Sequence, residues 1–252
     1  MDLKKIADYL DKYLDVSSFN DDSLNGLQVE NSGDVKKVAV GVDACLEAIL
    51  KAAEAACTML IVHHGLFWGR ESLLVGTLFR RIRALLLSDI ALYAAHLPLD
   101  AHPGVGNNAQ IARIVGLQDV QPFAMHRGRP IGMKGLLQTT QSLPEVLHDL
   151  DALLGPCTAT IQCGPRQIHS IGIVSGSATD PSLFQEIRTL GIDLLVTGEP
   201  KHGAYHLAQE LGLNIYYGGH YRSETFGPKA LGKHIQKRLK IPTVFLDVPS
   251  PF

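Results

Sequence analysis

The amino-acid sequence predicts an α/β fold made of two similar domains, and three observations support this. Apolar runs typical of buried strands alternate with segments of helical period along the chain, as in parallel sheets covered by helices. The order of these segments repeats in the two halves. The hydrophobic fraction of 46 % over 252 residues suits a core-forming protein of one or two domains.

The first half of the chain begins with a charged amphipathic helix, MDLKKIADYLDKYLDV. The strands that follow are short aliphatic runs, whereas the helices are longer, and one of them is rich in alanine. Gly116 is a suitable stop for the last helix of this half. We expect strands over residues 35–42, 59–62 and 90–95, and helices over residues 44–56, 79–88 and 108–115.

The second half begins with a possible strand and helix of its own and then repeats the order of the first half. A polar segment rich in turn formers, residues 118–130, is the best candidate for the boundary. We therefore predict domains over residues 1–125 and 126–252, with a C-terminal segment that can pack back on the first. Strands are expected over residues 132–139, 168–174, 192–197 and 215–217, and helices over residues 143–154, 181–190 and 204–211.

The two halves also match when they are laid side by side. VAVGVD corresponds to IGIVSG, TMLIVHHG to DLLVTGEP, and ALYAAHLPLD to IYYGGHYRSE. In the last pair His96 falls on His220 and Asp100 falls on Glu224. Any two βαβ units look somewhat alike, but a shared H-x-x-x-[DE] after the same strand favours a true duplication.

Histidines and carboxylates gather at predicted strand ends, where open α/β sheets bind ligands. Each residue has an ordinary structural explanation: a hydrogen-bonded turn, a helix cap for Asp100, or a surface acid for Glu224. Their repetition at corresponding positions instead favours a site for divalent metal ions, for which imidazole and carboxylate are good ligands. The candidate residues are His63, His64, His96, Asp100, His220 and Glu224.

Composition narrows the remaining classes of function. The net charge of −2 gives no basic surface for nucleic acid, so we expect no such partner. No apolar run is long enough to span a membrane, and because the first segment lacks an apolar core we do not expect it to be a signal peptide. Four cysteines without a C-x-x-C pair fit free thiols in a reducing cytoplasm, namely Cys45, Cys57, Cys157 and Cys163.

Four motifs in order resemble the Nif-three-like (YbgI-type) family, often labelled GTP cyclohydrolase 1 type 2 homologue. They are NGLQVE at residues 25–30, VHHGLFW at 62–68, HLPLDAHPGVGNNAQIA at 96–112 and GHYRSETFG at 219–227. The resemblance spans nearly the whole chain. It implies two similar α/β domains, a dinuclear divalent-metal site in the cleft between them, and a ring-shaped homohexamer, or toroid.

The resemblance also implies roles for particular residues. The implied ligands of two divalent metal ions per chain are His63, His64, Asp100, His220 and Glu224, with Glu224 as the bridge. His96, Asn25 and Gln28 match positions that line the cleft, and Glu199 matches an acid that supports the ligands. A set of imidazoles and carboxylates without thiolate fits Zn, Fe, Mn, Co or Ni.

Two kinds of function follow from such a site. The first is a metal-dependent hydrolase with cyclohydrolase-like action on C–N bonds of a nucleotide or related small molecule, in which His96 transfers protons. Arg222 or Lys201 is a candidate for meeting a phosphate group. The alternative is a non-catalytic protein that binds, senses or delivers metal, or that supports an assembly.

Overall fold

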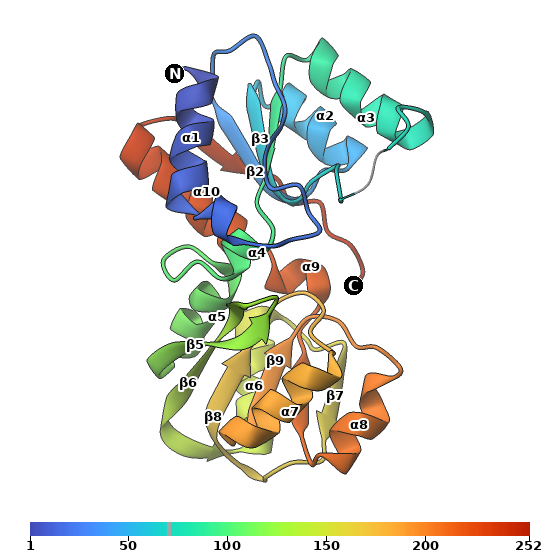
Figure 1. Ribbon diagram of the computed structural model, residues 1–252. Coiled ribbons are helices and arrows are strands. Elements are labelled where there is room, and N and C mark those ends of the chain that lie inside the picture. Colours follow the sequence, from blue (N-terminus) through green and yellow to red (C-terminus); the bar gives the residue numbers. More distant parts are fainter. Residues whose placement is uncertain (70–71) are drawn as a thin grey trace. The chain divides into compact units, whose positions relative to one another are not determined.

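The chain folds into two compact units that are built from different stretches of sequence. A computed structural model describes residues 1–69 and 72–252 (Figure 1). The first unit comprises residues 1–105 and 227–248, and the second comprises residues 106–226 and 249–252. The second unit is therefore inserted into the sequence of the first.

The first unit is built on a five-stranded sheet in the order β1-β4-β3-β2-β11. Strands β2, β3, β4 and β11 run parallel to one another, and β1 pairs antiparallel with β4 at one edge. The strands are β1 (Gly26–Val29), β2 (Val38–Asp43), β3 (Met59–His64), β4 (Ala91–Ala94) and β11 (Thr243–Phe245).

Helices cover both faces of this sheet, as Figure 1 shows. Because successive strand residues point to opposite faces, Val38 and Val40 of β2 join one core while Ala39 joins the other. Helices α1 (Leu3–Tyr13) and α10 (Phe226–Leu239) contribute to the first core, and α2 (Leu46–Glu54) and α3 (Gly76–Leu87) contribute to the second. Burial on both faces explains why the strand sequences are almost continuously apolar.

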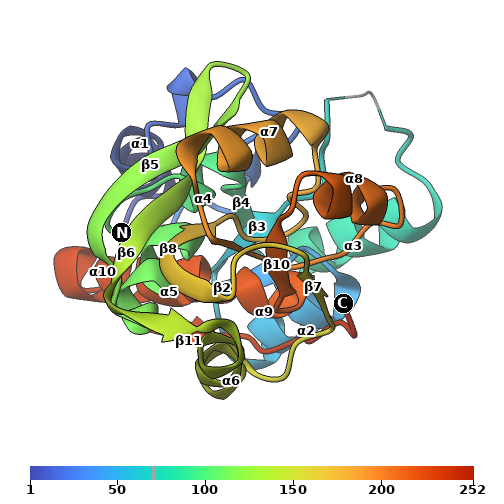
Figure 2. The same cartoon turned by 90° about the horizontal axis from the view of Figure 1, so that it is seen from below.

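The second unit is built on a six-stranded sheet in the order β5-β6-β8-β9-β10-β7. Helices α5 and α6 pack on one face, and α7 and α8 pack on the other (Figure 2). The strands are β5 (Gln118–His126), β6 (Arg129–Ser142), β7 (Ala159–Gln162), β8 (Gln167–Ile173), β9 (Leu194–Thr197) and β10 (Asn214–Tyr217). The helices are α5 (Asn107–Val115), α6 (Leu143–Leu154), α7 (Pro181–Leu190) and α8 (Ala204–Glu210).

The two units repeat one topology. Three parallel strands follow one another in each, β2-β3-β4 in the first and β8-β9-β10 in the second. In each unit an earlier strand, β1 or β7, pairs antiparallel with the last of the three. A four-residue helix comes soon after that last strand, α4 (Leu97–Asp100) after β4 and α9 (His220–Ser223) after β10. This arrangement confirms the predicted pair of similar α/β domains.

The units divide the chain at different places from those that the sequence suggested. The compact units separate at Val105 and Gly106 rather than near residue 125. The polar segment 118–130 is not a linker, because it forms β5 and the start of β6 at the edge of the second sheet. Residues 227–248 supply α10 and β11 to the first unit, where Leu231 and Ile235 enter its core. Within the described ranges, no helix is both long and apolar enough to cross a membrane.

Candidate metal centre

Three imidazoles of the first unit converge where two neighbouring parallel strands end. His63 and His64 are the last residues of β3, and His96 follows β4 directly before α4. The ring centroids of His63 lie 4.7 Å from His64 and 5.0 Å from His96. One ring nitrogen from each histidine lies within 4.8 Å of the others, so the three could hold a metal ion together. We call these three residues the histidine cluster.

Each imidazole of the histidine cluster is oriented through its Nδ1 atom. His63 Nδ1 donates to the backbone oxygen of Ala95 at 2.9 Å. His64 Nδ1 donates to the Asp43 carboxylate at 2.9 Å, and His96 Nδ1 donates to Asp21, also at 2.9 Å. A proton on Nδ1 leaves the lone pair of a neutral imidazole on Nε2, the arrangement found when histidines ligate metals.

Asp21 organises the loop around His96. Its carboxylate accepts from His96 Nδ1, from the Leu97 amide at 3.1 Å and from the Asn25 side chain at 2.9 Å. Burial raises the pKa of the Asp21 carboxyl, but the hydrogen bond and charge of His96, with the Asn25 amide, hold it well below its usual range. Asp21 is therefore ionised at neutral pH and can support a positive charge on His96.

Asp100 brings a buried carboxylate to the histidine cluster. It is the last residue of α4, and its Oδ2 atom lies 3.4 Å from Nε2 of His63. The His63 side chain is fully buried and that of Asp100 is nearly so. Pro98 stands at the start of this short helix, where a missing N–H costs nothing. The turn after His96 thus places the Asp100 carboxylate next to the histidine cluster.

Asn25 and Gln28 support the backbone of this region. The Asn25 side-chain oxygen accepts from the His96 amide at 2.7 Å. Gln28 accepts from the Leu66 amide at 2.7 Å and donates to the Leu24 oxygen at 2.7 Å. These amide groups position the loops that carry the histidines.

The second unit brings together the corresponding pair, His220 and Glu224. His220 is the first residue of α9, and its Nε2 atom lies 3.2 Å from the buried Glu224 carboxylate. Its Nδ1 atom donates to Glu199 at 2.8 Å. Burial lowers the pKa of His220, but Glu224 and Glu199 outweigh it and raise the pKa to about 9. A metal ion bound at Nε2 would have to replace a proton there.

Two glycines allow this pair to sit tightly against the backbone. Gly176 has φ +68°, and a Cβ atom there would collide with the Glu224 carboxylate. A Cβ on Gly198 would lie 2.8 Å from the Cα of His220. The Gly176 amide donates to Ser223 at 3.0 Å, which ties the end of β8 to α9. Backbone packing therefore places both side chains in one defined position.

Other candidate residues play different parts. Arg222 donates to the Pro156 backbone oxygen at 2.5 Å and packs against Gly155 and Gly219, so its guanidinium braces the chain before β7. Lys201 is exposed in the loop after β9.

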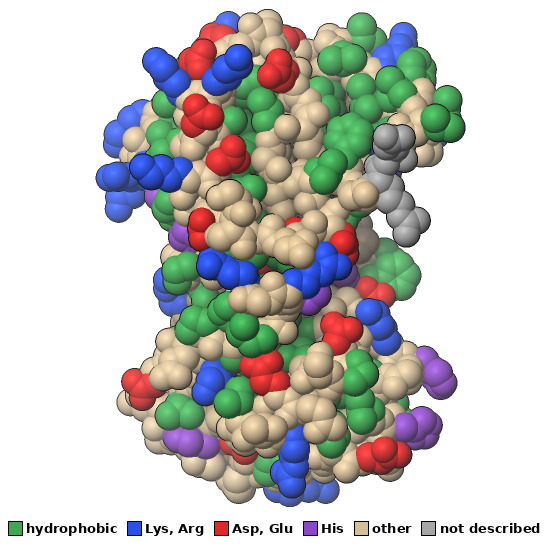
Figure 3. Space-filling view, in the orientation of Figure 1, with side chains coloured by type: hydrophobic (Ala, Val, Ile, Leu, Met, Phe, Trp, Pro, Cys, Tyr) green, Lys and Arg blue, Asp and Glu red, His purple; other side chains and the backbone are tan. Residues whose placement is uncertain are grey.

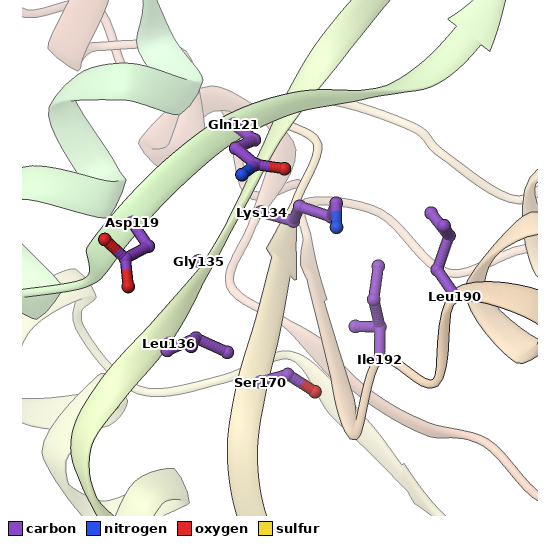
Figure 4. Close-up of a pocket in the computed structure, with 8 residues that line it drawn as sticks. All are labelled: Asp119, Gln121, Lys134, Gly135, Leu136, Ser170, Leu190 and Ile192. Atoms are coloured by element: carbon purple, nitrogen blue, oxygen red, sulfur yellow. The ribbon is translucent and has the colours of Figure 1, made fainter.

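A separate pocket of about 170 Å³ lies on the sheet of the second unit (Figure 4). Its charged lining residues are Asp119 and Lys134, and it contains no imidazole.

Sequence reasoning identified Glu199, which accepts from His220, but it missed Asp43 and Asp21, the carboxylates that accept from His64 and His96. Asp43 ends β2 beside β3, paired in register with His64, so its position at a strand end was a usable signal. Asp21 lies in an irregular loop without periodicity, and no sequence pattern pointed to it.

The donor set suits a divalent transition metal. Each unit offers imidazole nitrogen beside a buried carboxylate at a strand end: His63 with Asp100, and His220 with Glu224. Imidazole and carboxylate without thiolate are ligands that Zn, Fe, Mn, Co and Ni accept. The residues present therefore fit the metal ions that the sequence led us to expect.

Comparison with known proteins agrees with these features. The sequence profile of the Duf34/NIF3 (NGG1p interacting factor 3) family matches residues 1–251. A relative from Archaeoglobus fulgidus is 42 % identical, and one from Deinococcus radiodurans is 39 % identical. The alignments cover 99 % of both chains in the first case, and 98 % of this chain and 93 % of the relative in the second. Both relatives carry the name GTP cyclohydrolase 1 type 2 homolog.

Solved structures share the fold over the full length. The crystal structure of TTHA1606 from Thermus thermophilus superposes with a TM-score of 0.91 at 45 % identity, covering 100 % of both chains. The protein ybgI, described as of unknown function, superposes with a TM-score of 0.92 at 31 % identity, again covering 100 % of both chains. The sequence match over the whole length and the shared fold lead to one conclusion. The chain belongs to the Duf34/NIF3 family.

Proposed function

We propose that this protein binds two divalent metal ions and uses them to hydrolyse a nucleotide or a related small molecule. One observation carries the proposal: the four candidate imidazoles, His63, His64, His96 and His220, are each held at Nδ1 by a carboxylate or a backbone carbonyl. This arrangement orients metal-binding histidines and fixes their tautomer. Four histidines that served only to stabilise the fold would not all need a hydrogen-bond acceptor at Nδ1.

The proposed donors are His63, His64, Asp100, His220 and Glu224. His63 and Asp100 are buried together, as Glu224 is beside His220, so exposure to bulk water does not weaken their affinity for a cation. Divalent ions held by these residues would act as Lewis acids and lower the pKa of water to about 7. The name that the relatives carry suggests a C–N bond of a purine nucleotide as the target.

His96 is the proposed proton-transfer residue. Its Nδ1 atom is hydrogen-bonded to the ionised Asp21, which fixes the orientation of the ring and would stabilise the imidazolium after Nε2 takes a proton. The backbone amides of His96 and Leu97 are fixed by Asn25 and Asp21. The imidazole of His96 is therefore already oriented for proton transfer, and this loop does not have to rearrange for catalysis.

The first experiment measures metal content after purification without chelator. We expect about two divalent ions per wild-type chain, and their loss in the His63→Ala, His64→Ala double variant. A matched control replaces two exposed histidines of the second unit, His148 and His169, with alanine and should keep the metal. Wild-type protein that binds no metal even after reconstitution would contradict the proposal.

The second experiment separates an enzyme from a metal carrier. Reconstituted protein is incubated with a panel of nucleotides, and products are separated by chromatography. We expect turnover that Glu224→Gln abolishes. Tight metal binding without turnover of any nucleotide would instead favour a protein that stores, senses or delivers metal.

A further inference from the structure

Trp68 stands beside the histidine cluster, and the proposed chemistry does not use it. It is the only tryptophan of the chain. Its ring centroid lies 5.1 Å from that of His96, which it meets edge to face, and 5.9 Å from that of His64. The indole thus lies about as close to the ring of the proposed proton-transfer group as the ring of His63 does.

The indole is held in place by the backbone around it. Its Nε1–H donates to the Gly65 oxygen at 3.0 Å. The loop that carries it is joined to the preceding loop by the Leu24 amide, which donates to Phe67 at 3.0 Å. Gln28 bridges the same two loops through Leu66 and Leu24. The position of the ring is therefore set before any ligand arrives, which limits the entropy lost on binding.

A ring fixed in this way is still open to solvent. Trp68 is 39 % exposed and the neighbouring Leu24 is 51 % exposed. For a side chain of this size the open part is on the order of 100 Å², about one face of the indole. A tryptophan that only filled the core would have its rings covered. An open, pre-positioned aromatic face is what proteins use to stack a planar heterocycle.

We propose that Trp68 is the platform on which a nitrogen heterocycle of nucleobase size stacks beside the metal ions. The inference rests on the proposed function and narrows its substrate class to molecules with a flat heteroaromatic ring. Sugar phosphates that lack such a ring are excluded as substrates. Trp68 is therefore a specificity-determining residue, and the histidines and carboxylates carry out the reaction.

The test uses zinc-loaded protein and three probes: guanosine, GMP and ribose 5-phosphate. Because Trp68 is the only tryptophan, its emission reports directly on stacking. We expect guanosine and GMP to quench the emission, whereas ribose 5-phosphate leaves it unchanged. Calorimetry should show that Trp68→Leu weakens GMP binding by about 5- to 150-fold, the range of base stacking on an aromatic ring. Trp68→Phe, which keeps an aromatic face, should retain most of the affinity.

Phe79→Leu is the matched control, because Phe79 is also an exposed aromatic residue of the first unit, on α3. Its affinity for GMP should equal that of the wild type. The zinc content of every variant is measured in parallel. Zinc-loaded wild type that binds neither guanosine nor GMP, or equal GMP affinity in Trp68→Leu, would overturn the inference and leave the metal proposal standing. Wild type that takes up no zinc would overturn both.

Discussion

At the scale of single residues, the decisive feature is the group that accepts a hydrogen bond from Nδ1 of each histidine. The sequence revealed His63, His64, His96 and His220 because each follows an aliphatic run that ends at a sheet edge. It did not reveal Asp21, because the contact with His96 spans 75 positions and joins an irregular loop to a strand end. Contacts of that kind are set by tertiary folding, and no local pattern encodes them.

Substituting the supporting carboxylates distinguishes the roles of the imidazoles. In the proposed donor set His64 is a ligand and His96 is not. We therefore expect Asp43→Asn to lower zinc affinity about 10- to 100-fold, the usual cost of losing such a partner. Asp21→Asn should leave zinc affinity nearly unchanged and reduce nucleotide turnover. Competition titration with a zinc chelator measures both affinities. An equal loss of affinity in Asp21→Asn would show that His96 is a ligand.

At the scale of secondary structure, the buried elements could be predicted and the edge elements could not. The central strands β2, β3, β4, β9 and β10 are almost wholly buried, and β8 is buried over its last three residues. The strand β5 is mostly exposed, and β11 has only three residues. Edge strands like these pair on one side and show little hydrophobic pattern. Helix α10 has only a few apolar positions and contains two glycines, so its period was not recognised.

The turn after β3 tolerates no side chain at Gly65. A Cβ atom there would lie 2.5 Å from the Gln28 side-chain oxygen and 2.6 Å from the Ala94 Cβ. We expect Gly65→Ala to lower the free energy of unfolding by about 1–3 kcal/mol, as overpacking does, and to weaken zinc binding by displacing His64. Urea denaturation measures the first effect. Gly203→Ala, where a Cβ meets nothing within 4 Å, is the control, and equal stability of the two variants would refute the prediction.

Packing of α1 against α10 makes stability depend on pH through His234. Burial, with the nearby charges of Arg238 and Lys237, lowers the pKa of His234, and Tyr9 Oη lies 2.6 Å from its Nε2. The unfolded chain therefore binds this proton more readily than the folded one, so stability falls as the pH drops below about 6.5. We expect His234→Gln to lose less stability than the wild type between pH 7.5 and pH 5.5. Parallel losses in urea denaturation would argue against this role.

At the scale of the whole molecule, helix α3 presents apolar side chains to solvent. Leu85 is the only residue of α3 that is fully buried. Figure 3 shows hydrophobic side chains gathered over the region of this helix. The exposed residues in and just before it are Leu73, Leu74, Val75, Phe79, Leu86 and Leu87. Their open area is on the order of 700 Å², close to the share of one partner in a stable protein interface.

This surface leads to a test of the expected self-association. The ring-shaped hexamer stays a prediction, and α3 is the face that we expect one copy to present to another. Leu86→Glu combined with Leu87→Glu should reduce the mass measured by light scattering, because two buried charges would oppose the contact. Leu153→Glu, at an exposed leucine of α6, should leave the mass unchanged. An unaltered assembly in the double variant would exclude α3 from the interface.

The insertion of one unit into the other sets an order for folding during translation. Residues 106–226 form a complete unit except for its last four residues, whereas α10 and β11 of the first unit are synthesised later. At roughly 5–20 residues per second, a ribosome needs on the order of ten seconds to make the inserted unit. Throughout that time β2 lacks its partner β11, and Val38 and Val40 lack the cover of Leu231 and Ile235. During synthesis of the inserted unit, the first unit therefore exposes the edge of its sheet at β2 and the apolar face that α10 later covers. Chaperones recognise exposed edges and apolar surfaces of this kind.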